Sequence, residues 1–432
     1  MSSKGLVFIG LFAFCSIGAL FLPHLGVYAY VVDYCINPAD QWYGRPFAQT
    51  GIRFSLILAL ATMVGAVLQR KKLKFGKILC RHEIYIIFFL ILVWISYLIN
   101  PETIGRYTYT DHPTIKLTKI VIFLFLITHL ITDIKKISFL YLVLIAVATV
   151  LGVKAYGMPY GSFVGGRLEG LGGADFSDAN RFAGFMVGIV FLAGVQFLRS
   201  GFWGRLSCLV PGAFIVNSLM LARSRGALLG LVVGLCCSGF LAPQKYRVKI
   251  LILLILVCLG VFYLADEQVL NRMSSIQSSE QIRDSSSQSR LEIWAGGGRM
   301  LVANPILGVG PGNFYTNIER YQPKHPGRDA HNTLIRCAGE IGFLGLGCFM
   351  LILYSSFKLL FSCLRDSKKL PEGFSNDVLW LSYGSILATI AVLVYGMTGT
   401  LLYTEYFWWL LAFPVSIRRA LDNQLISIEN LD

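Results

Sequence analysis

The sequence predicts an all-α protein that crosses a membrane many times. Hydrophobic residues make up 55% of the 432 positions and charged residues only 14%, and the mean hydropathy is +0.63. Apolar runs long enough to span a bilayer, for which a helix needs about 20 residues, recur from end to end. The ten cysteines lie mostly inside these runs without metal-ligand or disulfide spacing, so we interpret them as small core residues.

We expect twelve membrane-spanning helices. They cover residues 5–32, 51–68, 83–99, 117–131, 138–153, 179–198, 207–222, 226–242, 250–264, 333–359, 377–397 and 404–418. Pro23 and His24 interrupt the first of them, so two shorter helices are an alternative there. No clear small-residue cleavage site follows the first apolar run, which favours a membrane span over a cleaved signal.

Basic residues predict the orientation of these helices. The formal net charge is +14, and the short loops between alternate spans carry much of it. These loop residues are Arg70, Lys71, Lys72, Lys74, Lys77, Arg81, Lys135, Lys136, Arg199, Arg205, Lys245, Arg247, Lys249, Lys358, Arg365, Lys368, Lys369, Arg418 and Arg419. The positive-inside rule places them in the cytoplasm, together with both termini. The charge therefore indicates membrane topology, and no nucleic-acid partner is expected.

One long polar loop divides the chain into three parts. Residues 1–264 hold nine predicted spans, residues 265–332 form a loop on the exported side, and residues 333–432 hold three spans and a cytoplasmic C-terminus. Within the loop, Leu291, Trp294, Met300 and Leu301 predict an amphipathic helix lying on the membrane. Asn304-Pro305 ends this helix, and the glycines of GVGPGN then give a tight turn.

His331 is the best candidate for catalysis. It lies where the exported loop becomes a helix, and an imidazole there can act as a general base near neutral pH. The positive end of the helix dipole favours its neutral form. The alternative is an ordinary interfacial histidine. His325 and Asp329 are near His331 in sequence but lack the spacing of metal ligands, so we expect no metal site.

Several arginines are candidates for binding a phosphate group. Arg223 and Arg225 occupy a minimal turn between two apolar runs, where a charge is costly unless it is paired or faces water. A guanidinium binds phosphate through two parallel hydrogen bonds, although an arginine here can also extend to the interface. We favour Arg225 because the small Gly226 and Ala227 leave its surroundings open. Arg290, taken alone, has the character of a surface arginine.

Four further polar positions stand near, at or inside apolar segments. Asn180 and Arg181 fall in the first turn of the predicted span 179–198, where they line a cavity or cap the helix, and Arg167 belongs to the same polar group. Glu340 lies inside the tenth span, nine residues after His331 and so about 180° around the helix. It is therefore no direct partner of His331, and a pair with Arg336 or with another helix is expected.

Three motifs in the second half of the chain occur in a recognisable order. They are SRSRGALLGL, then SRLEIWAGGGRMLVANPILGVGPGNF, then HNTLIRCAGEIGFLGLG. Together with the predicted topology, they resemble the O-antigen ligase and polymerase superfamily of bacterial envelopes. The resemblance implies a GT-C-like helical bundle of the bacterial inner membrane with a large periplasmic loop. It also implies transfer of a glycan from undecaprenyl diphosphate to an acceptor hydroxyl.

The resemblance also assigns roles to residues. The essential histidine of the superfamily falls on His331 and the essential arginines fall on Arg225 and Arg290, while Asn180 and Arg181 match a polar donor-side segment. Arg223 joins the donor-binding group, and Asn332, Glu340 and Arg167 are supporting positions. Two arginines can neutralise a diphosphate leaving group where other glycosyltransferases use a metal, so no cofactor is expected. A single displacement would invert the anomeric centre.

Three functions remain open at this point. An O-antigen ligase, whose acceptor is a sugar of the lipid A core, is favoured by the compact chain. A chain polymerase or a protein O-glycosylating relative performs the same chemistry on another acceptor. A transporter for the lipid-linked glycan is the alternative of a different class, and it is disfavoured because no internal repeat is evident and the polar residues concentrate in the exported loop.

Overall fold

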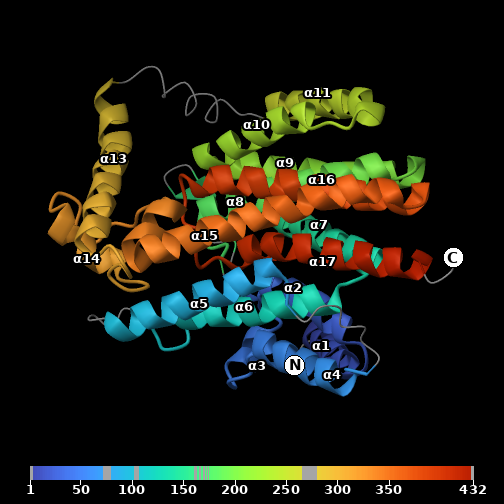
Figure 1. Ribbon diagram of the computed structural model, residues 1–432, viewed down its shortest axis with the longest axis horizontal. Helices are drawn as coiled ribbons and strands as arrows, with labels where there is room; N and C mark the ends of the chain where they lie inside the picture. Colours follow the sequence, from blue (N-terminus) through green and yellow to red (C-terminus); the bar gives the residue numbers. More distant parts are fainter. Residues whose placement is uncertain are drawn as a thin grey trace.

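The protein is an all-α polytopic membrane protein, as the sequence predicted. The computed structural model describes residues 3–71, 79–101, 107–159, 163–164, 167–168, 171, 173, 175–264 and 280–429. Long helices lie side by side along the longest axis of the molecule, and α13 runs across one end of them (Figure 1). Eight of the described helices are long and apolar enough to cross a membrane, and three shorter apolar helices accompany them.

Eleven of the twelve predicted spans each coincide with one helix. These helices are α4 (Phe54–Leu68), α5 (Arg81–Ile99), α6 (Pro113–Leu130), α7 (Ile134–Tyr156), α8 (Ala179–Arg199), α9 (Phe202–Ala222), α10 (Arg225–Phe240), α11 (Arg247–Leu264), α15 (Thr333–Asp366), α16 (Glu372–Gly396) and α17 (Glu405–Glu429). The remaining elements of the two chain ends and loops are α1 (Ser3–Phe21), α2 (Pro23–Ile36), η1 (Pro38–Asp40), α3 (Arg45–Ala48), β1 (Phe163–Val164), β2 (Arg167–Leu168), η3 (Gln244–Tyr246), α13 (Glu280–Ala303), α14 (Phe314–Tyr321) and η4 (Ser367–Lys369). The two short strands pair antiparallel between α7 and α8.

Residues 5–32 form a hairpin of two helices, α1 and α2, which is the alternative that Pro23 and His24 left open, and not one span. Proline ends a helix because it lacks an N–H and clashes with the preceding turn, and here α2 begins at Pro23. The rings of Phe8 and Phe54 lie 5.2 Å apart at the start of α4, so α1 runs parallel to α4. Ser55 donates to Asp33 over 2.5 Å, so α2 runs in the opposite direction.

This hairpin corrects the predicted position of the N-terminus. Because the chain reverses at Pro23, α1 begins at the end of the bundle where α3 lies, and Phe8 packs 6.5 Å from Phe47 of that helix. The last helix, α17, begins at this end and runs away from it. The two termini therefore lie toward opposite ends of the bundle, contrary to the expectation that both share one side.

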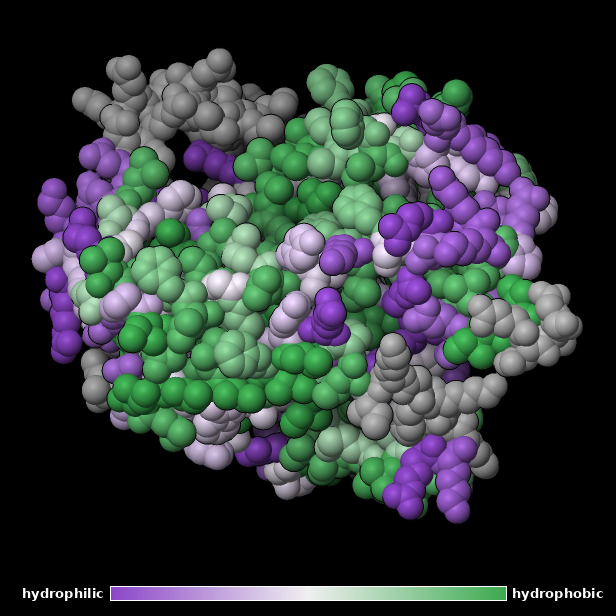
Figure 2. Space-filling view, viewed as in Figure 1, coloured by the Kyte–Doolittle hydropathy of each residue, from purple (hydrophilic) through white to green (hydrophobic). Residues whose placement is uncertain are grey.

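Apart from the N-terminal hairpin, the loops between the helices lie at two polar ends of the bundle, which agrees with the alternation that the charge pattern predicted. Figure 2 shows a broad hydrophobic region in the middle of the molecule and hydrophilic side chains gathered toward both ends. Ion pairs link basic residues of the predicted cytoplasmic loops to acids at the same end. Examples are Arg199 with Asp377 at 2.8 Å and Arg418 with Asp366 at 2.6 Å. This end faces away from α13 and α14.

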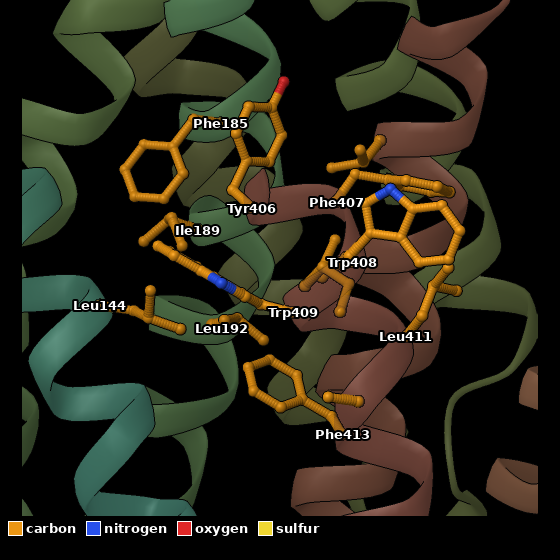
Figure 3. Close-up of a cluster of buried hydrophobic side chains, with 14 of the residues drawn as sticks. Leu144, Phe185, Ile189, Leu192, Tyr406, Phe407, Trp408, Trp409, Leu411 and Phe413 are labelled. Carbon is orange, nitrogen blue, oxygen red and sulfur yellow. The ribbon is translucent and has the colours of Figure 1, made fainter. Parts of the chain in front are cut away.

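The interior between the two ends is a close-packed aromatic and aliphatic core. α17 contributes Tyr406 and Trp409, which lie against Phe185 and Ile189 of α8 (Figure 3). Trp408 is fully buried, and its indole N–H donates to the carbonyl of Leu402 over 2.9 Å. Packing in this core holds α8 and α17 together. The N-termini of both helices lie at the end of the bundle that holds the candidate site.

α13 is the helix that was predicted in the loop, but the residues on its buried face differ in part from those predicted. The helix ends at Ala303, directly before Asn304-Pro305. Met300 is fully buried, whereas Leu291 is 62% exposed and Ile293 is buried in its place. The buried face packs on α14 and α15 through Met300, Phe314 and Ile318, so its partners are protein helices instead of the membrane.

The glycine turn after α13 fits into a break in α15. Gly342 has φ 71° and ψ −168°, which interrupts the helix, and this region is open only to glycine. Val309 N–H donates to the Gly339 carbonyl over 2.9 Å, and Gly310 N–H donates to the Glu340 carbonyl over 3.0 Å. The loop thereby satisfies carbonyls that the interrupted helix leaves without an intrahelical donor.

Gly308→Ala should destabilise the protein by about 2–4 kcal/mol, because an L-residue is strained at φ +66° and its Cβ would clash with the Glu340 backbone. The measurement is the thermal unfolding midpoint in detergent. Gly298→Ala is the matched control, since a Cβ there meets nothing within 4 Å and α13 gains helix propensity. An unchanged midpoint for Gly308→Ala would show that the loop is not held against the helix break.

Candidate active site

Four helices begin at one end of the bundle and bring their N-termini together. These are α8, α10, α15 and α17. Ser224, which precedes α10, donates to Asn180 of α8 over 3.0 Å, and Thr333 of α15 donates to the Gly396 carbonyl over 2.9 Å. The helix dipole makes each N-terminus favourable for negative charge. The end as a whole is therefore suited to a negatively charged group.

Asn332 fixes the start of α15 beside the turn that joins α16 and α17. Its side-chain oxygen accepts from the N–H groups of Leu334 at 2.9 Å and Ile335 at 3.1 Å. Its side-chain amide donates to the Met397 carbonyl over 3.1 Å. Asn332 is thus a helix N-cap that anchors the residue before it, His331.

His331 presents its imidazole at this end. Its backbone is left-handed, with φ 44°, and its side chain is 52% exposed. Burial lowers the pKa of His331 below its usual value, the positive charges of Arg290 and Arg181 lower it further, and Asp329 and Asp178 oppose the shift. The ring is therefore neutral at pH 7 and able to accept a proton.

Arg290 reaches the same place from α13. Trp294, one turn further along that helix, donates its indole N–H to the carbonyl of Ala330 over 2.9 Å. Residues four apart share one face of a helix, so Arg290 lies on the face that meets His331. The contribution of Arg290 to the lowered pKa of His331 agrees with this position. The structure thus brings together two residues that lie 41 positions apart.

Asn180 and Arg181 occupy the first turn of α8, but neither is its cap. Asp178 caps the helix, accepting from the N–H groups of both residues at 3.0 Å. Asn180 instead accepts the hydroxyl of Ser224, which holds the turn before α10 against α8. Arg181 lies 3.8 Å from Asp175 and within electrostatic range of His331. Of the two, Arg181 carries the charge that faces the site.

Arg223 and Arg225 differ in exposure. Arg223 is 8% exposed and forms the left-handed C-cap of α9, whereas Arg225 is exposed at the first position of α10. Gly226 itself is closely packed, because an added Cβ there would clash with Thr398. The glycine lets the start of α10 pack against the turn that Asn332 also contacts. Arg225 and His331 therefore flank one turn.

A buried network lies beneath His331. Glu340 is fully buried and accepts from Arg336 at 3.0 Å and from the Tyr403 hydroxyl at 2.7 Å, which agrees with the expected pairing of Glu340 with Arg336. Arg336 also donates to Asp329 over 3.2 Å. The four-residue spacing of Arg336 and Glu340 was a visible signal in the sequence, whereas the contribution of Tyr403 was not.

Arg167 lies in β2, where its backbone pairs with Val164, and its side chain is outside the described residues. In the described part of the chain, no group of three or more His, Cys, Asp or Glu side chains is arranged to hold a metal ion. The site thus offers one neutral imidazole, several guanidiniums and four helix N-termini. That set can take a proton from a hydroxyl and bind an anionic leaving group.

The fold is that of a polytopic membrane protein, and its candidate site lies at one end of the helical bundle. Residues 210–350, from within α9 to within α15, match the family model described as O-antigen ligase. This match confirms the resemblance of the second half of the chain to the O-antigen ligase and polymerase superfamily. The matched segment contains Arg223, Arg225, Arg290, His331 and Glu340. No curated protein matches the chain.

Proposed function

We propose that the protein is an O-antigen ligase of the bacterial inner membrane. In this proposal it transfers a glycan from undecaprenyl diphosphate to the lipid A-core oligosaccharide at the periplasmic face, without a metal and with inversion. The observation that carries the proposal is the meeting of His331 with Arg290 and Arg181 among four helix N-termini. Arg225 borders the same turn as His331.

The arrangement supplies what such a transfer requires. The acceptor oxygen attacks the anomeric carbon as its proton passes to Nε2 of His331, and the bond from that carbon to the diphosphate breaks. Negative charge then develops on the leaving diphosphate. Guanidiniums bind phosphate oxygens through parallel hydrogen bonds, and the dipoles of the helices that begin here favour the negative charge. A single displacement of this kind inverts the anomeric configuration.

The carrier lipid has a suitable groove beside the site. An apolar cavity of about 390 Å³ lies between α8, α9 and α11, lined by residues such as Val190, Gly212, Leu256 and Tyr263. A Cβ added at Gly212 meets nothing within 4 Å, so this wall is open. The groove reaches Val216, six residues or about 9 Å from the end of α9. We place the polyprenyl chain here, with its diphosphate at Arg225.

A reconstituted transfer reaction tests the proposal. Purified protein with undecaprenyl-diphosphate glycan, lipid A-core and a chelator should join the glycan to the core and release undecaprenyl diphosphate. The anomeric configuration of the new bond, read by NMR, should be inverted relative to the donor. A longer glycan still on the carrier would identify a polymerase instead, and movement of the donor across the bilayer without transfer would identify a transporter.

A deletion strain separates ligase from polymerase independently of purification. Loss of a ligase leaves long polymer on the carrier lipid, whereas loss of a polymerase leaves single repeats attached to the core. The ligase proposal predicts the first pattern. The second pattern would indicate that the site performs the same chemistry but that its acceptor is another lipid-linked glycan.

A further inference from the structure

We infer that Asp329 is a positioning residue for His331, which holds the imidazole and stabilises the proton that it accepts. This inference rests on the proposed function, because it assigns a partner to the general base of that reaction. Asp329 precedes His331 by two residues and does not itself reach the reacting atoms. Its role follows from four contacts that surround its carboxylate.

The Asp329 carboxylate is held from three directions. Oδ1 accepts from Arg336 Nη1 at 3.2 Å, and Oδ2 accepts from the Thr400 hydroxyl at 2.6 Å. Oδ2 also accepts the backbone N–H of His331 at 3.4 Å. Burial opposes ionisation of Asp329, but Arg336 and Thr400 prevail and hold its pKa below the usual value. The group therefore remains an anion throughout the pH range of activity.

The same oxygen that binds Thr400 lies 3.9 Å from Nδ1 of His331. This separation is longer than a hydrogen bond, and such contacts often shorten when substrate binds. Because Nδ1 is the ring nitrogen nearer Asp329, Nε2 is the nitrogen available to the acceptor hydroxyl. When Nε2 takes the proton, the Nδ1–H becomes part of an imidazolium beside a fixed carboxylate, and Asp329 itself stays unprotonated.

Arg336 does not cancel the charge of Asp329, because a second acid shares it. Glu340 accepts from Arg336 at 3.0 Å, and the guanidinium also lies over the Tyr403 ring, 5.2 Å from its centroid. Two carboxylates and one guanidinium leave one net negative charge below His331. A proton on the imidazole neutralises that charge, so the network favours the state that forms during transfer.

Cations on the neighbouring elements act in the opposite sense. Arg290 on α13 and Arg181 on α8 disfavour the imidazolium, while Asp178 beside Arg181 supports it. The two arginines favour the neutral form of His331 before the reaction. Asp329 is the only one of these charged groups that shares the short segment 329–331 with the imidazole, so its distance from the ring is the most closely fixed. It therefore determines how the ring is oriented.

Asp329→Asn is the variant that tests this role, because it keeps the shape and removes the charge. We expect transfer to slow by about 10²-fold with little change in KM for the donor. Without the anion, His331 should titrate at lower pH, so the acidic limb of the pH–rate profile should also move to lower pH. Asp329→Glu, which restores the charge, should recover part of the rate.

Glu319→Gln is the matched control, since it also removes one acid from this loop region but at an exposed position on α14. Its profile should equal that of the wild type. A wild-type rate and an unmoved limb in Asp329→Asn would overturn the inference. A lower rate with an unmoved limb and no recovery in Asp329→Glu would also overturn it, because that pattern indicates a structural role alone.

A titration by NMR separates this inference from the proposed function. The protein contains six histidines, so ¹⁵N-histidine labelling in detergent gives few signals, and His331→Asn assigns the one of interest. We expect the His331 signal to titrate at lower pH in Asp329→Asn than in the wild type, whether or not transfer is measured. Identical titrations would refute the role of Asp329 and leave the proposed transfer untouched.

Discussion

His331→Asn should reduce glycan transfer by about 10³-fold while leaving the protein folded and able to bind the donor. Asparagine tolerates the left-handed backbone at this position, where φ is 44°, but it cannot take a proton from the acceptor hydroxyl. The rate is measured with purified protein, carrier-linked glycan and saturating acceptor. This variant has the largest expected effect because no other described imidazole lies at the four N-termini.

The pH dependence of the wild-type rate tests the general-base role of His331 independently of the variant. Burial and nearby arginines lower the pKa of His331 from 6.5, so the rate should rise with pH through a value below 6.5 and be level at pH 7. His325→Asn is the matched control, because His325 pairs with Glu292 at 2.9 Å in the loop region and has no place in the proposed reaction. Its rate should stay close to that of the wild type, whereas full activity in His331→Asn would remove the general-base assignment.

Arg290→Gln and Arg225→Gln should each weaken binding of undecaprenyl diphosphate by roughly 10- to 100-fold. A hydrogen bond to a charged group contributes about 1.5–3 kcal/mol, which corresponds to this range. Binding of a labelled carrier in detergent measures the effect. The double variant should bind more weakly than either single variant, since both guanidiniums meet the same leaving group in the proposal.

Arg290→Gln should also change the pH–rate profile, and Arg225→Gln serves as the comparison. Removal of the Arg290 charge stabilises the imidazolium, so the acidic limb of the pH–rate profile should move to higher pH. Arg225 is not among the main contributors to the lowered pKa of His331, so its variant should move the limb less than Arg290→Gln does. Arg320→Gln, at an exposed position of α14, is the charge-matched control. Carrier affinity in either site variant equal to this control would contradict a diphosphate role.

The predicted helices and the described helices agree closely because the membrane imposes one simple rule. Hydrocarbon requires about 20 consecutive apolar residues and internal hydrogen bonds, and both requirements are local. The N-terminal hairpin escaped this rule. A proline in an apolar run indicates an interruption of the helix. The same sequence is compatible with a kinked helix or with a reversal of the chain, and only packing against α4 decides between them.

The candidate site was predictable as a set of residues but not as a geometry. His331, Arg225 and Arg290 came from motifs, and their charges in an apolar chain made them conspicuous. Asp329 was considered only as a metal ligand, because nothing in the sequence shows that Thr400 and Arg336 hold it. Gly226 was interpreted as leaving the surroundings of Arg225 open, although the glycine itself is the point where α10 meets Thr398.

By itself the sequence determined the fold class, most of the helices and the resemblance to the superfamily, because hydrophobic run length and short motifs are properties of neighbouring residues. Only the tertiary structure decided which side chains meet. The bridge from Trp294 to Ala330, the carboxylate beneath His331 and the insertion of the glycine turn into α15 join residues that are distant in the chain. Such contacts depend on how helices pack, and packing is a property of the whole bundle.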